Sequence, residues 1–220
     1  MRINNLLLKH YLKNVIFING TACAGKSTMV KMLADKYNLI CCGENYECIP
    51  ENITTPQTHP NLSYFQTMSD WQAFVNRTPK EYHDWIVGCS NELTQFEITY
   101  LISISRSQKV IVDTNIPIEI LREIADYNQV AIMICPTKMS VEYFFERNDA
   151  DKAFIREQIM KSDNPEKTMA NYRDILKYIA RHSYDKFKDS GFFTLERADA
   201  TKDTRQETAE TLAKHFGLST

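Results

Sequence analysis

The stretch FINGTACAGKST, residues 17–28, decides the fold. It places Gly20, Gly25, Lys26 and Ser27 in the spacing G-x-x-x-x-G-K-[ST]. A loop of this kind turns its backbone N–H groups toward a phosphate chain, while the lysine reaches the outer phosphates and the hydroxyl ligates Mg²⁺. The residues between the two glycines are small enough for the backbone to approach a ligand closely. They are Thr21, Ala22, Cys23 and Ala24.

The segments on either side of this loop predict a strand before it and a helix after it. NVIFI, residues 14–18, is a continuous apolar run of the kind found in strands buried on both faces. The segment that begins at Lys26 carries apolar residues on one helical face, namely Met29, Val30, Leu33, Ala34 and Tyr37. The N-terminus of such a helix favours an anion. We therefore expect residues 20–28, with Thr28 as the last, to bind a nucleoside triphosphate.

Composition limits the remaining possibilities. A chain of 220 residues suits one domain, residues 1–220, and a net charge of −2 provides no field to attract nucleic acid or an anionic membrane. No apolar run approaches the roughly 20 residues that span a bilayer. The first residues show no cleavage site of a secretion signal, so the sequence predicts a cytoplasmic protein.

Cysteines and histidines provide no pattern of metal ligands. The six cysteines include no C-x₂-C pair, and three of them lie in or at the ends of predicted strands, which favours reduced, buried thiols. The five histidines show no ligand spacing. We expect no metal other than the Mg²⁺ of the nucleotide.

Strand and helix patterns alternate along the chain. Strands are predicted at residues 14–18, 38–42, 109–113, 130–135 and 191–196. Helices are predicted at residues 26–38, 81–105, 116–128 and from about 140 to 161, with two more beginning after Asn164 and at a capping box formed by Thr204 and Glu207. This alternation predicts an α/β fold with a doubly wound, five-stranded parallel sheet. Ligands of such sheets gather at the carboxyl ends of the strands.

Asp113 ends the apolar strand VIVD and is the best candidate for a second Mg²⁺ ligand. If its strand lies beside the first one, the carboxylate reaches Ser27 and the ion or its water shell. The alternative is a strand-end aspartate that caps the following turn with Thr114 and Asn115.

Glu44 follows the second strand and could accept a proton from an acceptor hydroxyl that attacks the γ-phosphate. A solvated loop glutamate is the alternative, and Glu47 and Glu51 compete for the same role.

Arg147 opens a charged stretch that could close over the triphosphate and stabilise the transferring phosphoryl group. Lys152 and Arg156 follow in this lid-like segment, residues 146–164. Because acidic and basic residues alternate there, a solvated helix face is the alternative.

Residues 45–84 form an irregular, aromatic-rich insert that could bind the acceptor. The rings between Tyr64 and Trp85 could line such a pocket. For most of them, the core of a small helical excursion is the expected role.

Together the segments GTACAGKST, CCGE, VIVDTN and ERNDADKAFIREQI resemble the P-loop kinase superfamily of nucleoside monophosphate kinases and of shikimate, gluconate and chloramphenicol kinases. The resemblance covers nearly the whole chain, although only the first segment is specific. It implies that the third strand lies next to the first, that Glu44 acts as base or acceptor ligand, and that residues 198–204 pack near the adenine. It also implies ATP and Mg²⁺ as cofactors.

Two departures from this family leave the acceptor open. The D-G-x-P-R sequence of nucleoside monophosphate kinases is absent, because Asp113 is followed by Thr114 and Asn115, and no R-x-x-x-R pair follows Arg147. The expected activity is phosphoryl transfer from ATP to a small molecule such as a nucleoside, nucleotide, sugar or other alcohol. A regulatory ATPase or GTPase is the alternative, although the N-K-x-D and D-x-x-G motifs of GTPases are absent.

Overall fold

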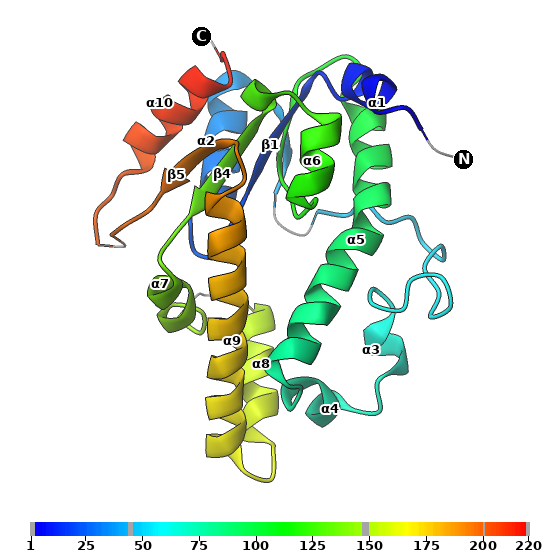
Figure 1. Ribbon diagram of the computed structural model, residues 1–220, viewed down its shortest axis with the longest axis vertical. Helices are drawn as coiled ribbons and strands as arrows, with labels where there is room; N and C mark the ends of the chain where they lie inside the picture. Colours follow the sequence, from blue (N-terminus) through cyan, green and yellow to red (C-terminus); the bar gives the residue numbers. More distant parts are fainter. Residues whose placement is uncertain (1–2, 44–45, 147–149, 200, 219–220) are drawn as a thin grey trace.

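The computed structural model describes residues 3–43, 46–146, 150–199 and 201–218. Its centre is a five-stranded sheet in the order β2-β3-β1-β4-β5, and every neighbouring pair of strands is parallel (Figure 1). The strands are β1 Val15–Gly20, β2 Ile40–Cys42, β3 Val110–Asp113, β4 Val130–Ile134 and β5 Phe193–Glu196. The predicted parallel sheet of five strands is confirmed, as is the position of the third strand beside the first.

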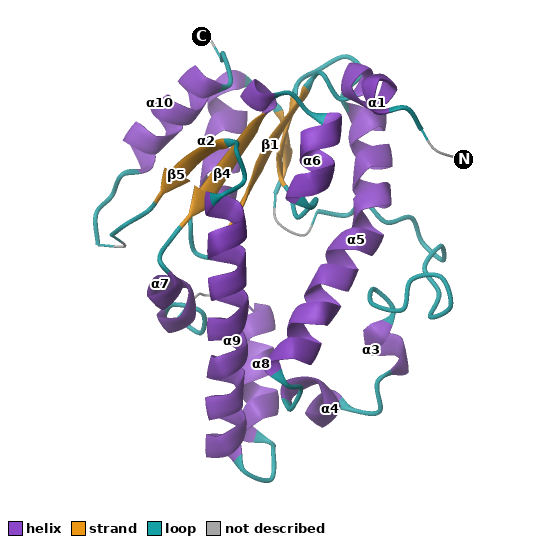
Figure 2. Cartoon of the chain, viewed as in Figure 1, coloured by secondary structure: helices purple, strands orange, loops and turns teal. Residues whose placement is uncertain are grey.

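Helices cover both faces of this sheet (Figure 2). One face packs against α2, Lys26–Tyr37, and α10, Arg205–His215. The other packs against α1, Asn5–Tyr11, α6, Ile118–Ile124, and the sheet-side ends of two long helices, α5, Pro79–Ile104, and α9, Pro165–Lys188. Successive side chains of a strand point to opposite faces. The apolar runs are therefore continuous because each strand supplies residues to both cores.

A helical lobe lies beyond the carboxyl ends of the strands, in the lower half of Figure 1. It consists of α3, Tyr64–Thr67, α4, Trp71–Val75, α8, Ala150–Met160, and the adjoining halves of α5 and α9. Its core contains Phe74, Ile159 and Tyr172. The lobe joins the predicted insert to the lid-like segment, because the Trp71 and Phe154 rings lie 4.7 Å apart and Gln72 Nε2 donates to the Gln158 carbonyl at 3.0 Å.

Several local predictions differ from the structure. The helix expected from residue 140 to 161 is divided into α7, Thr137–Glu142, and α8, with turns at residues 143–146 between them. Helix α1 was not predicted, because none of its residues is fully buried and it shows no apolar stripe. A 3₁₀ turn, η1, occupies Tyr127–Gln129 at the end of the segment predicted as one helix.

The two predicted helix starts near the C-terminus have different outcomes. Asn164 caps α9 through its side chain, with Pro165 as the first helical residue. Thr204 precedes α10 but makes no side-chain cap bond, so the capping box predicted there is wrong. The structure has a capping box at the start of α5 instead, between Thr78 and Glu81.

All six cysteines are free thiols. Cys42, Cys48 and Cys135 are buried as small apolar residues, whereas Cys41 is exposed, contrary to the expectation for strand cysteines. Within the described ranges, no helix has the length and apolar character needed to cross a membrane.

Candidate functional site

The loop after β1 begins at a position that only glycine can occupy. Gly20 has a φ of 140°, and a Cβ atom there would lie 1.7 Å from the carbonyl oxygen of Met133 on β4. The next residue continues the pairing, since the Thr21 amide donates to the same carbonyl at 2.9 Å. The chain thus leaves the sheet against the backbone of its neighbour, which explains the first glycine of the motif.

The second glycine sets the start of α2. Gly25 is the N-cap residue with a φ of 92°, a left-handed conformation that disfavours other residues. Cys23 also has a positive φ, 64°. Helix α2 begins at Lys26, so its first turn presents amides without intrahelical acceptors beside the loop, together with the positive end of the helix dipole.

The loop is anchored through its carbonyl oxygens. Ala22 O accepts from Ser140 Oγ at 3.0 Å and from Cys135 Sγ at 3.0 Å, while Cys23 O accepts from Arg197 Nη1 at 3.2 Å. These donors come from the ends of β4 and β5 and from α7. Beyond Thr21, these contacts hold the loop through its carbonyl oxygens, which is compatible with a loop whose amides bind an anion.

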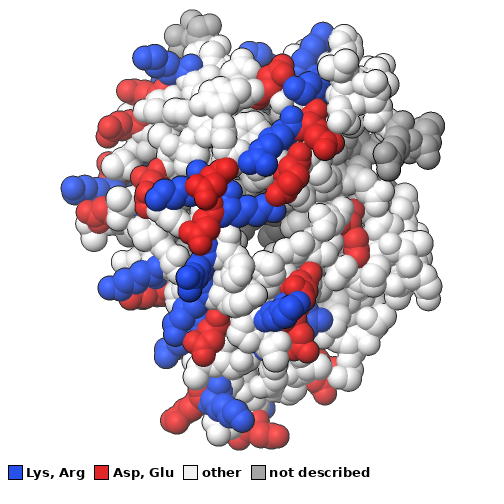
Figure 3. Space-filling model, viewed as in Figure 1, with Lys and Arg blue, Asp and Glu red and all other residues white. Residues whose placement is uncertain are grey.

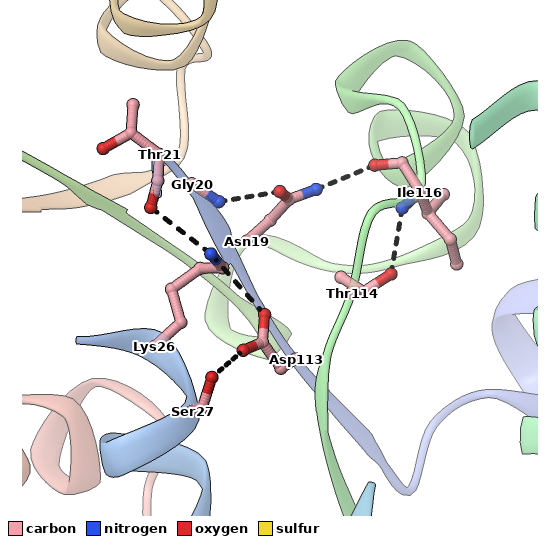
Figure 4. A network of polar contacts seen from close by, with 8 residues as sticks. All are labelled: Asn19, Gly20, Thr21, Lys26, Ser27, Asp113, Thr114 and Ile116. Carbon is pink, nitrogen blue, oxygen red and sulfur yellow. Dashed lines mark hydrogen bonds and ion pairs between the residues drawn. The ribbon is translucent and has the colours of Figure 1, made fainter. Parts of the chain in front are cut away.

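Lys26, Ser27 and Asp113 meet at the carboxyl edge of β1 and β3 (Figure 4). Ser27 Oγ lies 2.7 Å from Asp113 Oδ2, and Lys26 Nζ lies 3.7 Å from Asp113 Oδ1 and 3.3 Å from the carbonyl oxygen of Thr21. The strand register brings them together, because Asp113 on β3 pairs with Ile18 on β1. The Asp113 side chain is only 3% exposed, so its charge acts in a partly desolvated environment.

Thr114 caps the turn after β3. Thr114 Oγ1 accepts from the Ile116 amide at 3.0 Å, and Asn19 Nδ2 donates to the Ile116 carbonyl at 2.8 Å (Figure 4). Asn19 Oδ1 in turn accepts from the Gly20 amide at 2.7 Å. This network joins the end of β3 to the beginning of the loop and directs Asp113 toward Ser27.

A hydroxyl and a carboxylate form a donor set that suits Mg²⁺, which prefers hard oxygen ligands and retains several of its waters. Ser27 and Asp113 fit that requirement without a third protein ligand. In the part of the chain that the structure describes, no group of three or more histidine, cysteine, aspartate or glutamate side chains is arranged to hold a metal. The pair could therefore supply two oxygen ligands to a magnesium ion that keeps its remaining waters.

Two cavities adjoin the loop. One, of about 350 Å³, lies between the start of α2 and the segment after β5, with Gly25, Thr28 and residues 201–205 among its lining. The other, of about 440 Å³, is lined by the loop itself, by Tyr143 and Glu146, and by Arg197. Together they leave open space on both sides of the loop, toward the segment after β5 and toward the turns after α7.

The remaining predicted residues have separate outcomes. Glu44 and Arg147 lie outside the described residues. Glu47 and Glu51 are exposed. Lys152 Nζ lies 5.6 Å from the Phe144 ring centroid, and Arg156 lines a third cavity of about 870 Å³ between α7 and α9, so neither lines the two cavities beside the loop.

The aromatic insert is core, as expected for most of its rings. Tyr64, Phe74, Tyr82 and Trp85 pack in the helical lobe, and the Arg77 guanidinium lies 3.7 Å from the Tyr64 ring centroid. The arginine is thus held by aromatic faces rather than by carboxylates.

Glu97 on α5 is a candidate that the sequence analysis missed. Its side chain is buried, and burial raises its pKa to about 7, with hydrogen bonding by Thr114 and Tyr46 opposing the shift and the nearby Asp113 charge adding to it. The available signal was a single acidic residue within the apolar run QFEITYLISI. Apolar residues of this helix such as Phe96 and Tyr100 recur at helical spacing, but they are only half-buried, whereas the fully buried positions are Thr94, Glu97 and Leu101.

A scan against protein-family models and a search of curated proteins both found no match, so the interpretation of this site depends on its geometry and chemistry.

Proposed function

We propose that this chain is a P-loop kinase that binds ATP with Mg²⁺ and transfers the γ-phosphoryl group to a small-molecule acceptor. The observation that carries the proposal is the meeting of Lys26, Ser27 and Asp113 beside a loop with two positive-φ glycines. A lysine, a hydroxyl and a carboxylate at the start of a helix are the groups that phosphoryl transfer requires around a triphosphate.

In the proposed mechanism, amides of residues 22–27 bind the phosphate oxygens, because those of Gly20 and Thr21 already donate within the protein, and Lys26 neutralises charge on the outer phosphates. Ser27 and Asp113 would hold Mg²⁺, which offsets negative charge on the phosphates when it is bound. Asp113 also orients Lys26, whose ammonium lies between that carboxylate and the Thr21 carbonyl. These groups act mainly by positioning and by electrostatic stabilisation, as expected for a loose phosphoryl-transfer transition state.

The nucleoside is assigned to the cavity beside β5. Its lining includes Met29, Met133 and Leu195 as apolar contacts, and Thr201 to Thr204 from the segment that the family resemblance places near the adenine. A planar base fits between such apolar side chains and a polar rim. The proton acceptor Glu44 and the closing cation Arg147 stay predictions from the sequence.

The proposal is tested by ATP binding and by ATP turnover in the presence of candidate acceptors. We expect Lys26→Ala to lower kcat by about 100-fold or more, because it removes a cation from the transferring phosphates. Asp113→Asn should raise the Mg²⁺ concentration needed for half-maximal rate. Lys31→Ala, an exposed lysine on the same helix, is the matched control and should leave both quantities unchanged.

Three results discriminate between the candidate functions. Turnover that rises with an acceptor and is lost in Lys26→Ala supports a kinase. Lys26-dependent ATP or GTP turnover that no acceptor stimulates would instead support the regulatory nucleotide hydrolase. Equal ATP affinity in the wild type and Lys26→Ala, with no turnover in either, would remove the loop from any nucleotide chemistry.

A further inference from the structure

Glu97 is a buried carboxylate with fewer hydrogen-bond partners than such a group requires. Its side chain is 2% exposed, and Oε1 has no hydrogen-bond partner within the described ranges. Burying an ionisable group without compensation is unfavourable, and an apolar residue or glutamine would suit a helix face against the sheet better. The fold therefore does not explain why a carboxylate occupies this position.

Tyr46 supplies a second unsatisfied group beside the first. Its hydroxyl is buried and likewise has no hydrogen-bond partner of normal geometry among the described residues, although it is close enough to Glu97 for each to alter the pKa of the other. The Tyr46 ring is held by Tyr100, with ring centroids 5.6 Å apart. A rigid phenol and a carboxylate thus lie together with hydrogen-bonding capacity unused, as expected of a site that awaits a ligand.

This pair lies close to Asp113, near the carboxyl ends of β2 and β3. Tyr46 follows β2, and its amide donates to the Gly43 carbonyl at 3.3 Å. Hydrogen bonding by Thr114, the residue directly after Asp113, lowers the pKa of Glu97. Because β3 lies between β1 and β2, the pair is on the β2 side of Asp113, whereas the phosphate loop is on the β1 side.

The surroundings of the pair are neutral or acidic. Besides burial, the pKa of Glu97 is shifted by Thr114, Tyr46 and Asp113. The pKa of Tyr46 is shifted by Glu97, Cys42 and Cys48. No cation is among them in the described part of the chain. Figure 3 also shows few charged residues on the face formed by α3 and the sheet-side half of α5, in contrast to the charged surface along α9. A phosphate or carboxylate of an acceptor would meet repulsion here, whereas a hydroxyl or ammonium would find an acceptor of its protons.

We propose that Glu97 and Tyr46 form the acceptor subsite and that they select neutral or cationic hydroxyl compounds, such as nucleosides, polyols or amino alcohols, over anionic ones such as nucleoside monophosphates or sugar acids. This inference rests on the proposed kinase function. Glu97 accepts a hydrogen bond from a hydroxyl or amine of the acceptor, and the Tyr46 hydroxyl binds a neighbouring oxygen. Both are specificity-determining residues rather than catalytic ones.

The test uses the full chain with ATP, Mg²⁺ and two sets of probes. Uridine, choline, kanamycin and chloramphenicol are the neutral or cationic set, and uridine monophosphate, gluconate and shikimate are the anionic set. Rates of phosphoryl transfer are measured for the wild type, Glu97→Gln and Tyr46→Phe, while ATP affinity is measured separately by calorimetry. Asp84→Asn, an exposed carboxylate on the same helix, is the matched control.

We expect transfer to a member of the first set and, at pH 8, where the Glu97 carboxyl is mostly ionised, a KM for it about 10- to 100-fold higher in Glu97→Gln, since hydrogen bonds to charged groups are strong. Tyr46→Phe should raise the same KM by a smaller factor, and Asp84→Asn should leave it unchanged. Preference for the anionic set, an unchanged KM in Glu97→Gln, or ATP turnover that neither set stimulates would overturn the acceptor assignment while ATP binding persists. Failure of the proposed kinase function itself would give a different result, because the wild type would then not bind ATP.

Discussion

Two carboxylates near the same sheet edge differ in their surroundings. Asp113 lies within reach of the Ser27 hydroxyl and the Lys26 ammonium. Glu97 is inserted from α5 into an apolar environment, where desolvation dominates and its pKa is raised to about 7. A group of this kind favours its neutral form in the folded protein and its charged form in the unfolded chain.

Stability should therefore depend on pH through Glu97. Its pKa is about 7 when folded against 4.5 ordinarily, so the folded state binds more protons between these values and stability falls as pH rises through this window. Glu97→Gln should thus gain stability relative to the wild type, by up to about 3 kcal/mol above pH 7 and by little below pH 4.5. Urea unfolding at a series of pH values measures this difference.

The control for this measurement is Asp84→Asn on the same helix, which removes an exposed carboxylate and should show no gain in the window. A difference between Glu97→Gln and the wild type that stays constant from pH 4.5 to pH 8 would contradict the raised pKa.

At the scale of elements, the start of α5 shows that a Thr-x-x-Glu spacing caps a helix only where the side-chain hydrogen bonds form. The Thr78 amide donates to Glu81 Oε2 at 2.8 Å, the Glu81 amide donates to Thr78 Oγ1 at 3.3 Å, and Pro79 is the first helical residue. Thr204 has the same spacing to Glu207 but no side-chain cap bond. The two threonines are therefore natural controls for each other.

We expect Thr78→Ala to lower the free energy of unfolding by about 1 kcal/mol, because it leaves helix N-terminal amides without an acceptor. Thr204→Ala should change it by no more than about 0.5 kcal/mol. Denaturant unfolding with an unchanged m-value is the measurement. Equal effects of the two substitutions would show that the spacing alone, and not the bond, determines stability.

At the scale of the whole molecule, α5 and α9 connect the sheet to the helical lobe. Leu101 on α5 packs in the sheet core, and Tyr172 on α9 packs in the lobe core. Phe187, at the other end of α9, packs against the sheet. Since neither helix has an interruption between the two cores, we expect sheet and lobe to unfold together.

Phe74→Ala in the lobe should accordingly lower the temperature of a single unfolding transition rather than create a second one. Phe74 is 2% exposed and lies among several rings, so the expected loss is about 3 to 5 kcal/mol. Phe65, 44% exposed, provides the control, and its alanine variant should lose about 1 kcal/mol. Calorimetry that resolves two transitions in Phe74→Ala would show that the lobe is an independent unit.

Much of the fold could be predicted because its signals are local. The five apolar runs and the helices between them are visible in residues a few positions apart, and the glycine spacing of residues 20–25 predicts a loop before its partners are known. Helix α1 was not predicted because none of its residues is fully buried, so it leaves no apolar stripe in the sequence. The structure has two helices, α7 and α8, where one was predicted from residue 140, because a charged sequence does not show where a turn interrupts a helix.

The sequence by itself determined the alternating strands and helices, the phosphate-loop spacing and the candidate Asp113, because each depends on backbone conformation or on period along one segment. Only the tertiary structure decided that Asp113 contacts Ser27, since the strand order β2-β3-β1 joins residues far apart in the chain. It also decided that Glu97 Oε1 and the Tyr46 hydroxyl lie buried near each other without a hydrogen bond of normal geometry. Burial and hydrogen bonding are set by the elements packed around a side chain and not by its neighbours in sequence.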